Sequence, residues 1–236
     1  MKKILIQESH YFNRSSWQNK FDNYLPNWTS IFELEFVKSN KDFNNSLLSA
    51  NICFCFDLDS TINIDKLDLD IFYLGISDFD YKEKYILPEK IKFFSSKGVS
   101  SRMIAEYTLM SSLMLVRRIK TAFDHQRTRK WNQADMILND KPILSNYKIG
   151  VLGLGANGQE IVNIFYNLGC EVFGLSRSKP DNLHLAKWYG SNEMNQILND
   201  CDIIIVSLPL NSQTENLISK NELEIIGEKS FLINIG

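Results

Sequence analysis

The sequence predicts an α/β protein built from two parallel-sheet domains. Short apolar runs alternate with longer amphipathic segments along the whole chain, which is typical of a parallel sheet flanked by helices. The texture changes near Ser100, and a glycine-rich turn follows the apolar run Lys148–Leu152. At roughly 100 to 200 residues per domain, 236 residues allow one large domain or two modest ones.

The first hundred residues contain five short runs with the length and composition of β-strands. Polar segments of helix length lie between some of them. We expect strands at Lys3–Ile6, Ile31–Val37, Ile52–Phe56, Ile71–Ile76 and Ile91–Phe94, and helices at Ser15–Tyr24 and Lys41–Ala50.

A longer helix is predicted to begin near Ser100 and Ser101, which are plausible capping residues, and to run toward Thr128 before a boundary at Pro142. Its apolar residues recur at helical spacing and form a Met-rich stripe. Stripes of this kind are usually core or a subunit interface, and both interpretations stay open here. The stripe consists of Met103, Tyr107, Met110 and Met114, widened by Ile104, Leu113 and Val116.

The segment from Tyr147 onward has the order strand, glycine turn, helix, strand. We expect the helix at Gln159–Leu168, ended by Gly169. The expected strands are Lys148–Leu152, Glu171–Leu175, Ile203–Val206 and Phe231–Ile235.

The glycine turn has the spacing G-x-G-x-x-G at Gly153, Gly155 and Gly158. The first glycine permits a tight turn, the second lets a pyrophosphate approach the backbone, and the third lets helix and strand pack closely. The exposed amides of Ala156 and Asn157 would then point at the anion, assisted by the helix dipole. The pattern predicts a dinucleotide site; the alternative is an ordinary glycine turn.

The residues after the second strand of this unit bear on which dinucleotide binds. An NAD site usually places Asp or Glu there, whereas this chain has Ser176, Arg177, Ser178 and Lys179. Arg177 can bind a 2′-phosphate through two hydrogen bonds, and the serine hydroxyls can donate to it. We therefore predict NADP as the preferred cofactor, with NAD as the alternative. A solvated basic loop without a ligand is the other interpretation.

Several motifs together resemble the D-isomer-specific 2-hydroxyacid dehydrogenase family. The turn at 148–158 is similar to the family's cofactor turn, and the run from Asp202 to Thr214 resembles its "lPlt-x-x-T" segment beside the nicotinamide. The helix motif "vAEy … R", the motif "qr … W" and the run before an "RG" pair are also matched in the family's order. The matching residues are Ile104 to Tyr107 with Arg117, Gln126 and Arg127 with Trp131, and Phe231 to Gly236.

The resemblance implies a flavodoxin-like substrate domain at 1–99 and a Rossmann NAD(P)-binding domain at 100–236, with 100–130 as an interdomain and dimer helix. It implies hydride transfer between the nicotinamide and a small 2-keto or 2-hydroxy acid. The run Leu175 to Ser178 is most similar to the glyoxylate/hydroxypyruvate reductase branch. The resemblance also implies that the complete protein is a homodimer.

The resemblance also implies further site residues. Leu208, Pro209, Thr214, Ile235 and Gly236 would line the cofactor, and Ser77 and Asp78 stand in the family's substrate-carboxylate loop. Asp78 occupies a position where glycine is usual, so the substrate identity is open. The family's catalytic Arg, Glu and His have no counterpart up to Gly236, and His10, His125 and His184 lack the family's Pro-His context. We assign no catalytic residue within this chain.

Because the family's catalytic residues have no counterpart up to Gly236, we expect the sequence to be an incomplete copy of a longer enzyme. A non-catalytic NAD(P)-binding regulator or an inactive remnant is the second hypothesis. A methyltransferase is disfavoured, because such enzymes usually need an acid where Ser176 stands.

Composition excludes other classes. With 26 basic and 28 acidic residues the net charge is −2, which gives no basis for nucleic-acid binding. No apolar run reaches the length of a membrane span or follows a signal-peptide pattern, so we expect a cytoplasmic protein. The four cysteines form no C-x-x-C pair, and we expect buried free thiols rather than a metal site.

Overall fold

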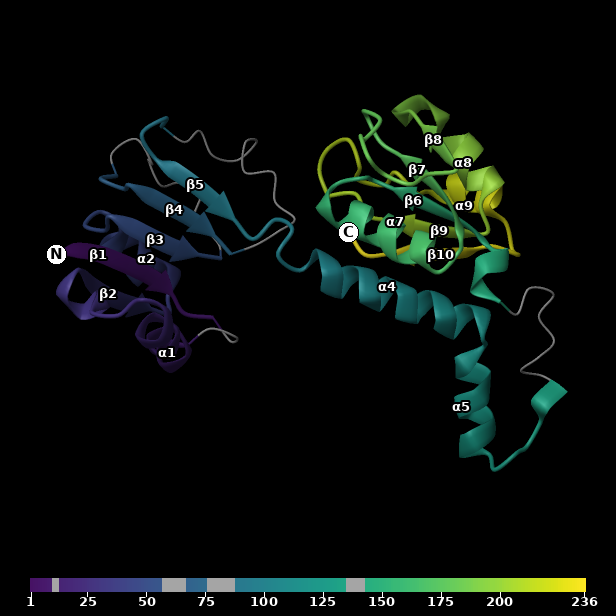
Figure 1. Cartoon of the computed structure of the whole chain (residues 1–236), viewed down its shortest axis with the longest axis horizontal. Coiled ribbons are helices and arrows are strands. Elements are labelled where there is room, and N and C mark those ends of the chain that lie inside the picture. Colours follow the sequence, from purple (N-terminus) through teal and green to yellow (C-terminus); the bar gives the residue numbers. More distant parts are fainter. Residues whose placement is uncertain (10–12, 57–66, 76–87, 135–142) are drawn as a thin grey trace. The chain divides into compact units, whose positions relative to one another are not determined.

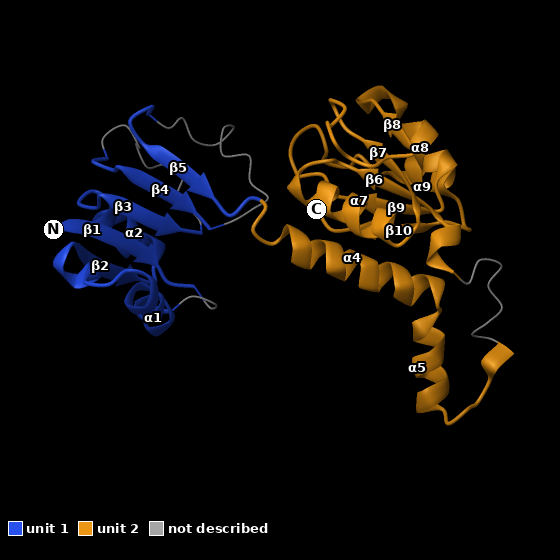
Figure 2. Ribbon diagram, viewed as in Figure 1, with its two compact units in different colours: residues 1–97 blue, residues 98–236 orange. Residues whose placement is uncertain are grey.

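A computed structural model describes residues 1–9, 13–56, 67–75, 88–134 and 143–236. The chain forms two compact units, residues 1–97 and 98–236, coloured separately in Figure 2. Each unit holds a five-stranded, fully parallel sheet with helices packed on it. The predicted α/β class is confirmed.

The sheet of the first unit has the strand order β2-β1-β3-β4-β5, which is the flavodoxin-like order. One core cluster lies between the sheet and helix α2 and includes Leu5, Phe43 and Phe72, and a second is formed by Ile4 and Ile6 together with Phe21 of helix α1. The described elements are β1 (Lys2–Gln7), α1 (Arg14–Tyr24), β2 (Phe32–Val37), α2 (Asn40–Leu47), β3 (Ile52–Cys55), β4 (Ile71–Leu74) and β5 (Lys92–Ser95), with a 3-10 turn at Trp28–Ser30.

The sheet of the second unit has the order β10-β9-β6-β7-β8, and its five strands are labelled in Figure 1. Numbered along this unit, the order is 5-4-1-2-3, which matches five strands of the Rossmann order. The strands are β6 (Lys148–Leu152), β7 (Glu171–Leu175), β8 (Lys187–Tyr189), β9 (Ile203–Val206) and β10 (Phe231–Asn234). β6 and β9 are adjacent and apolar on both faces, as buried parallel strands are.

Helices α4 (Ser101–Val116) and α7 (Ala156–Asn167) pack against each other beside this sheet (Figure 1). α4 buries its small side chains in this contact, because small residues let two helices approach closely. The buried residues are Ser101, Ala105, Thr108, Ser112 and Val116. The other helices of the unit are α5 (Ile119–Arg127), α8 (Met194–Asp200) and α9 (Lys220–Ile226), with 3-10 turns at Leu144–Asn146 and Ser191–Glu193.

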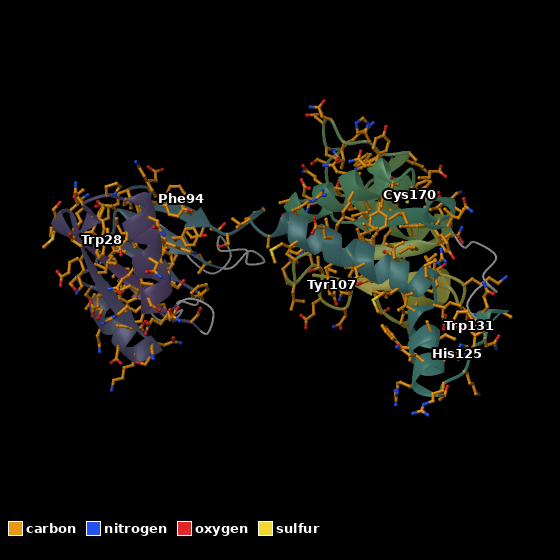
Figure 3. The ribbon with its side chains drawn as sticks, turned by 60° about the horizontal axis from the view of Figure 1, so that its bottom comes forward. Trp28, Phe94, Tyr107, His125, Trp131 and Cys170 are labelled. Atoms are coloured by element: carbon orange, nitrogen blue, oxygen red, sulfur yellow. The ribbon has the colours of Figure 1, made fainter. Side chains whose placement is uncertain are left out.

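Val116 of the Met-rich stripe is buried in the core, but the core interpretation was wrong for the methionines of α4 and for Tyr107. Met103 is 72% exposed and Tyr107, labelled in Figure 3, is 60% exposed. Met110, Leu113 and Met114 are exposed as well. Helical spacing identifies a face but not its partner, and here the small face meets α7. The subunit-interface interpretation stays a prediction.

The predicted continuous helix toward Thr128 was also wrong. α4 ends at Val116, and Arg118 has a left-handed backbone with φ of 50° before α5 begins. A non-glycine residue in this conformation stops a helix. The expected boundary at Pro142 lies outside the described residues.

Other elements differ in detail. α7 begins at Ala156, three residues before the predicted start, because the last residues of the glycine turn already belong to the helix. β8, α8 and α9 were not predicted, since they are only three, seven and seven residues long. β3, β4 and β10 end before their predicted limits, whereas β7 and β9 have the predicted bounds.

All four cysteines are buried free thiols, which confirms that expectation. Burial raises the pKa of Cys170 to about 11. Within the described ranges, no helix has the length and apolar character needed to cross a bilayer.

Candidate cofactor-binding site

The strand order of the second unit reverses between β6 and β9. In open α/β sheets, ligands bind beyond the carboxyl ends of the strands at such a point. The glycine turn follows β6, and Ser207 to Pro209 follow β9, so both segments leave the sheet at this edge. The two strands run side by side, with Leu152 opposite Val206.

Gly153 makes the tight turn that leads away from β6. Its φ is +96°, a conformation that residues with a side chain rarely adopt. A Cβ here would lie 2.6 Å from the carbonyl oxygen of Ser207. The Gly153 amide donates to the carbonyl of Leu175 at 2.9 Å, which ties the turn to β7.

Gly155 and Gly158 have different surroundings. A Cβ on Gly158 would overlap the carbonyl oxygen of Gly153, so this glycine permits close contact between helix and turn. A Cβ on Gly155 would meet nothing within 4 Å, and Gly155 is exposed. The space above Gly155 is therefore open to a ligand, and the turn fits the passage of a pyrophosphate.

Helix α7 begins at this open space. Gly155 is its N-cap, and no acidic side chain occupies its first turn. The amides of Ala156 and Asn157 belong to the first turn, whose amides have no acceptor within the helix. The side chain of Asn157 is held by Ser101, whose hydroxyl donates to Oδ1 of Asn157 at 2.7 Å.

The loop after β7 carries the predicted specificity residues. Arg177 and Ser178 are exposed, and Ser176 is half-buried. The Ser176 hydroxyl donates to the carbonyl oxygen of Ser178 at 2.7 Å and accepts from Nε1 of Trp188 at 3.0 Å. The sequence analysis did not identify Trp188 as a contact of this loop, because a strand of only three residues has no recognisable sequence pattern.

Leu208, Pro209 and Thr214 lie in the segment after β9. The Thr214 hydroxyl donates to the carbonyl of Pro209 at 2.5 Å, and the amide of Asn211 donates to that hydroxyl at 2.9 Å. Oδ1 of Asn211 accepts from the amides of Gln213 and Thr214. These bonds close a compact turn, in which Asn211 is a structural residue that the sequence analysis did not single out.

Ile235 and Gly236 lie next to that segment. The Ile235 amide donates to the carbonyl of Val206 at 3.0 Å. A Cβ on Gly236 would overlap the carbonyl oxygen of Leu208. The structure thus brings Gly153, Leu208 and Gly236 to one edge of the sheet.

The remaining candidate residues are either outside the described residues or placed elsewhere in the second unit. Ser77, Asp78 and His10 lie outside the described residues. His184 is exposed and stacks on the ring of Tyr166, with centroids 4.3 Å apart, and His125 lies in the last turn of α5 (Figure 3). Among the described residues, no group of three His, Cys, Asp or Glu side chains is arranged to hold a metal ion.

Comparison with known proteins decides the family. The D-isomer specific 2-hydroxyacid dehydrogenase NAD binding domain matches residues 109–236. The chain belongs to the D-isomer specific 2-hydroxyacid dehydrogenase family. The match covers the glycine turn, the loop after β7 and the segment after β9, so the second unit contains an NAD-binding domain.

Two curated family relatives are similar in sequence. The D-specific alpha-keto acid dehydrogenase of Enterococcus faecium is 29% identical over 135 residues, which is 56% of this chain and 38% of that protein. The glyoxylate/hydroxypyruvate reductase A of Arabidopsis thaliana is 28% identical over 177 residues, 75% of this chain and 50% of that protein. The matches thus span half or less of these relatives' lengths.

A solved structure is similar in fold. The D-isomer specific 2-hydroxyacid dehydrogenase family protein from Aeromonas salmonicida has a TM-score of 0.77 and 19% identity, covering all of this chain and 73% of that one. This likeness supports the α/β fold with its Rossmann-like second unit.

Proposed function

We propose that this chain is part of an NAD(P)-dependent oxidoreductase that reduces small 2-keto acids. The observation that carries the proposal is the glycine turn at the switch point between β6 and β9, with open space above Gly155 and a helix N-terminus behind it. In this proposal the second unit binds the nucleotide, and residues 1–99 contribute the substrate domain.

The nicotinamide nucleotide would supply the hydride. The residues of this chain would bind and orient it: the amides of Ala156 and Asn157 donate to the diphosphate, and Gly153 and Gly158 keep the turn compact. Leu208 and Gly236 lie against each other at the same sheet edge, and Thr214 holds the turn after Pro209. In this proposal Leu208, Pro209, Thr214, Ile235 and Gly236 would line the nicotinamide ring. We assign no catalytic proton transfer to a residue of this chain.

We propose NADP as the preferred cofactor. The turn after β7 has no carboxylate that would repel a 2′-phosphate, and Arg177 extends into solvent there. Among the described residues, Arg177 forms no ion pair, so its guanidinium can bind phosphate through two hydrogen bonds.

The proposed substrate is glyoxylate, hydroxypyruvate or a similar small 2-keto acid. The similarity to the Arabidopsis reductase and the run Leu175 to Ser178 support this class. Ser77 and Asp78 are proposed to lie near the substrate carboxylate. We further propose a homodimer through the exposed Met-rich stripe of α4, because a second copy would cover this apolar face.

Calorimetry tests the nucleotide site. The folded chain should bind NADPH more tightly than NADH, and the absence of heat with either nucleotide would refute the proposal. Arg177→Asp should raise the Kd of NADPH at least about tenfold, because charge-assisted bonds to phosphate are lost, and should change the Kd of NADH far less. Equal losses would refute the role of Arg177 in phosphate binding.

Turnover tests the reaction. NADPH oxidation by the chain is measured with glyoxylate and with hydroxypyruvate. Oxidation of NADPH by this chain with either acid would exclude the non-catalytic regulator, whereas binding without oxidation is expected both of the regulator and of an enzyme whose proton donor is not among these residues.

A further inference from the structure

A relay of two side-chain hydrogen bonds holds the turn after β7. Nε1 of Trp188 donates to the hydroxyl of Ser176 at 3.0 Å, and this hydroxyl donates to the carbonyl oxygen of Ser178 at 2.7 Å. The relay therefore connects strand β8 to the far side of a turn that has Arg177 at its middle.

The hydrogen count of the relay separates the roles of the two serines. A serine hydroxyl has one hydrogen to donate, and Ser176 donates its hydrogen to Ser178. Ser176 consequently has no donor left for a phosphate oxygen. The hydroxyl of Ser178 is different: it is exposed and makes no hydrogen bond within the described part of the chain, so it can donate to a ligand.

The backbone supports the same arrangement. The amide of Ser176 donates to the carbonyl of Tyr189 at 3.2 Å, and β7 pairs with β8 so that Gly174 lies opposite Trp188. Trp188 is half-buried and packs against the core of the unit, which fixes the direction of its N–H. Strand β8 therefore holds the turn from outside the nucleotide site.

This turn determines where the Arg177 guanidinium can reach. The guanidinium of an arginine on a free loop must give up conformational freedom when it binds, which costs affinity, and a turn closed beforehand reduces that cost. Closing the turn between Ser176 and Ser178 places Arg177 and the free Ser178 hydroxyl on consecutive residues of one constrained segment. A phosphate that binds the Arg177 guanidinium would therefore be within hydrogen-bonding reach of the Ser178 hydroxyl.

We propose that Trp188 and Ser176 are positioning residues for coenzyme specificity. They shape the turn from which Arg177 and Ser178 bind the 2′-phosphate, and they do not contact the phosphate themselves. The inference rests on the proposed NADP site and adds two residues to it: Trp188 as a new determinant, and Ser176 in a structural role instead of a donor role.

The test measures the Kd of NADPH and of NADH separately by calorimetry. Trp188→Phe keeps an aromatic ring and removes the N–H; Ser176→Ala removes the hydroxyl. Each variant should raise the Kd of NADPH by about threefold to tenfold, the usual value of one hydrogen bond, and change that of NADH less than about twofold. Because both act through one relay, the double variant should be little worse than the poorer single variant.

Two further variants complete the test. Ser176→Thr keeps a hydroxyl and should retain the NADPH preference, which separates loss of the hydrogen bond from general disturbance. Ser178→Ala should weaken NADPH binding without affecting the relay. If Trp188→Phe lowers stability in chemical denaturation, the Ser176→Ala and Ser176→Thr pair decides the question, because Ser176 lies in a surface loop.

The outcomes are distinguishable. If the unaltered chain binds neither nucleotide, the proposed function itself fails. If the unaltered chain prefers NADPH and Ser176→Ala weakens its binding but Trp188→Phe does not, Ser176 contacts phosphate directly and the inference is overturned. Equal weakening of NADPH and NADH in both variants would likewise overturn it.

Discussion

Ser101 donates a hydrogen bond from its hydroxyl to Oδ1 of Asn157 at 2.7 Å, which joins the first turn of α4 to the first turn of α7. The bond fixes the carboxamide with its oxygen toward α4, so the two N–H groups of Asn157 are left for another acceptor. Ser101 is 3% exposed. The start of α4 therefore orients a side chain within the proposed phosphate turn.

Ser101→Ala should destabilise the second unit by about 1 kcal/mol and raise the Kd of NADPH severalfold. The substitution removes a buried hydrogen bond and releases the carboxamide of Asn157. Denaturant unfolding and calorimetry measure the two effects. Ser100→Ala is the matched control, because the Ser100 side chain makes no capping hydrogen bond, and it should change stability by less than about 0.5 kcal/mol. Equal effects of both variants would contradict the prediction.

Gly155→Val and Gly158→Ala should have opposite consequences. Gly155 has open space around it and an extended backbone with φ of −72° and ψ of −164°, which a residue with a side chain can adopt. Gly155→Val should therefore fold with stability within about 1 kcal/mol of the unaltered chain, while its side chain blocks the pyrophosphate. Gly158→Ala should lose about 1–3 kcal/mol, because the new Cβ would overlap the Gly153 carbonyl. Unfolding curves and nucleotide calorimetry distinguish them. Normal NADPH binding by Gly155→Val would refute the assigned turn.

Met110→Lys should dissociate the proposed dimer. Met110 is 46% exposed on the apolar stripe of α4, and a buried ammonium group in an interface is costly. Sedimentation should show the dimer becoming a monomer, with stability of the monomer changed by less than about 0.5 kcal/mol. Asn167→Lys, on an exposed position of α7, serves as the control. A monomeric unaltered chain would refute the dimer proposal.

Stability should fall in alkaline solution. Burial raises the pKa of Cys170 from 9.0 to about 11, and burial together with Asp200 and Asp202 raises the pKa of Cys201 to about 12. In the unfolded chain these thiols ionise near pH 9, while in the folded chain they stay protonated. The stabilisation is complete below pH 9 and is lost as pH rises toward 11 and 12.

Cys170→Ala removes one of these titrations. The unfolding free energy of this variant should decline less steeply between pH 9 and 11 than that of the unaltered chain. Denaturant unfolding at several pH values measures the slopes. Identical slopes would show that Cys170 does not contribute.

The amino-acid pattern predicted correctly those features that depend on residues close together in the sequence. The β7 and β9 bounds, the tight turn at Gly153 and the α/β class follow from apolar runs and from glycine spacing, which are local properties. The pattern did not predict short elements such as β8, and it did not predict which face of helix α4 would be buried.

The sequence by itself determined the glycine turn, the basic loop after β7 and the longer strands of the second unit, because each depends on residues close together in the chain. Only the tertiary structure decided that α4 buries Ser101 and Thr108 rather than its methionines, and that Trp188 reaches Ser176. The physical reason is that packing partners lie far apart in sequence: α4 selects its buried face by how closely it can approach α7, and a hydrogen bond between strands depends on their register.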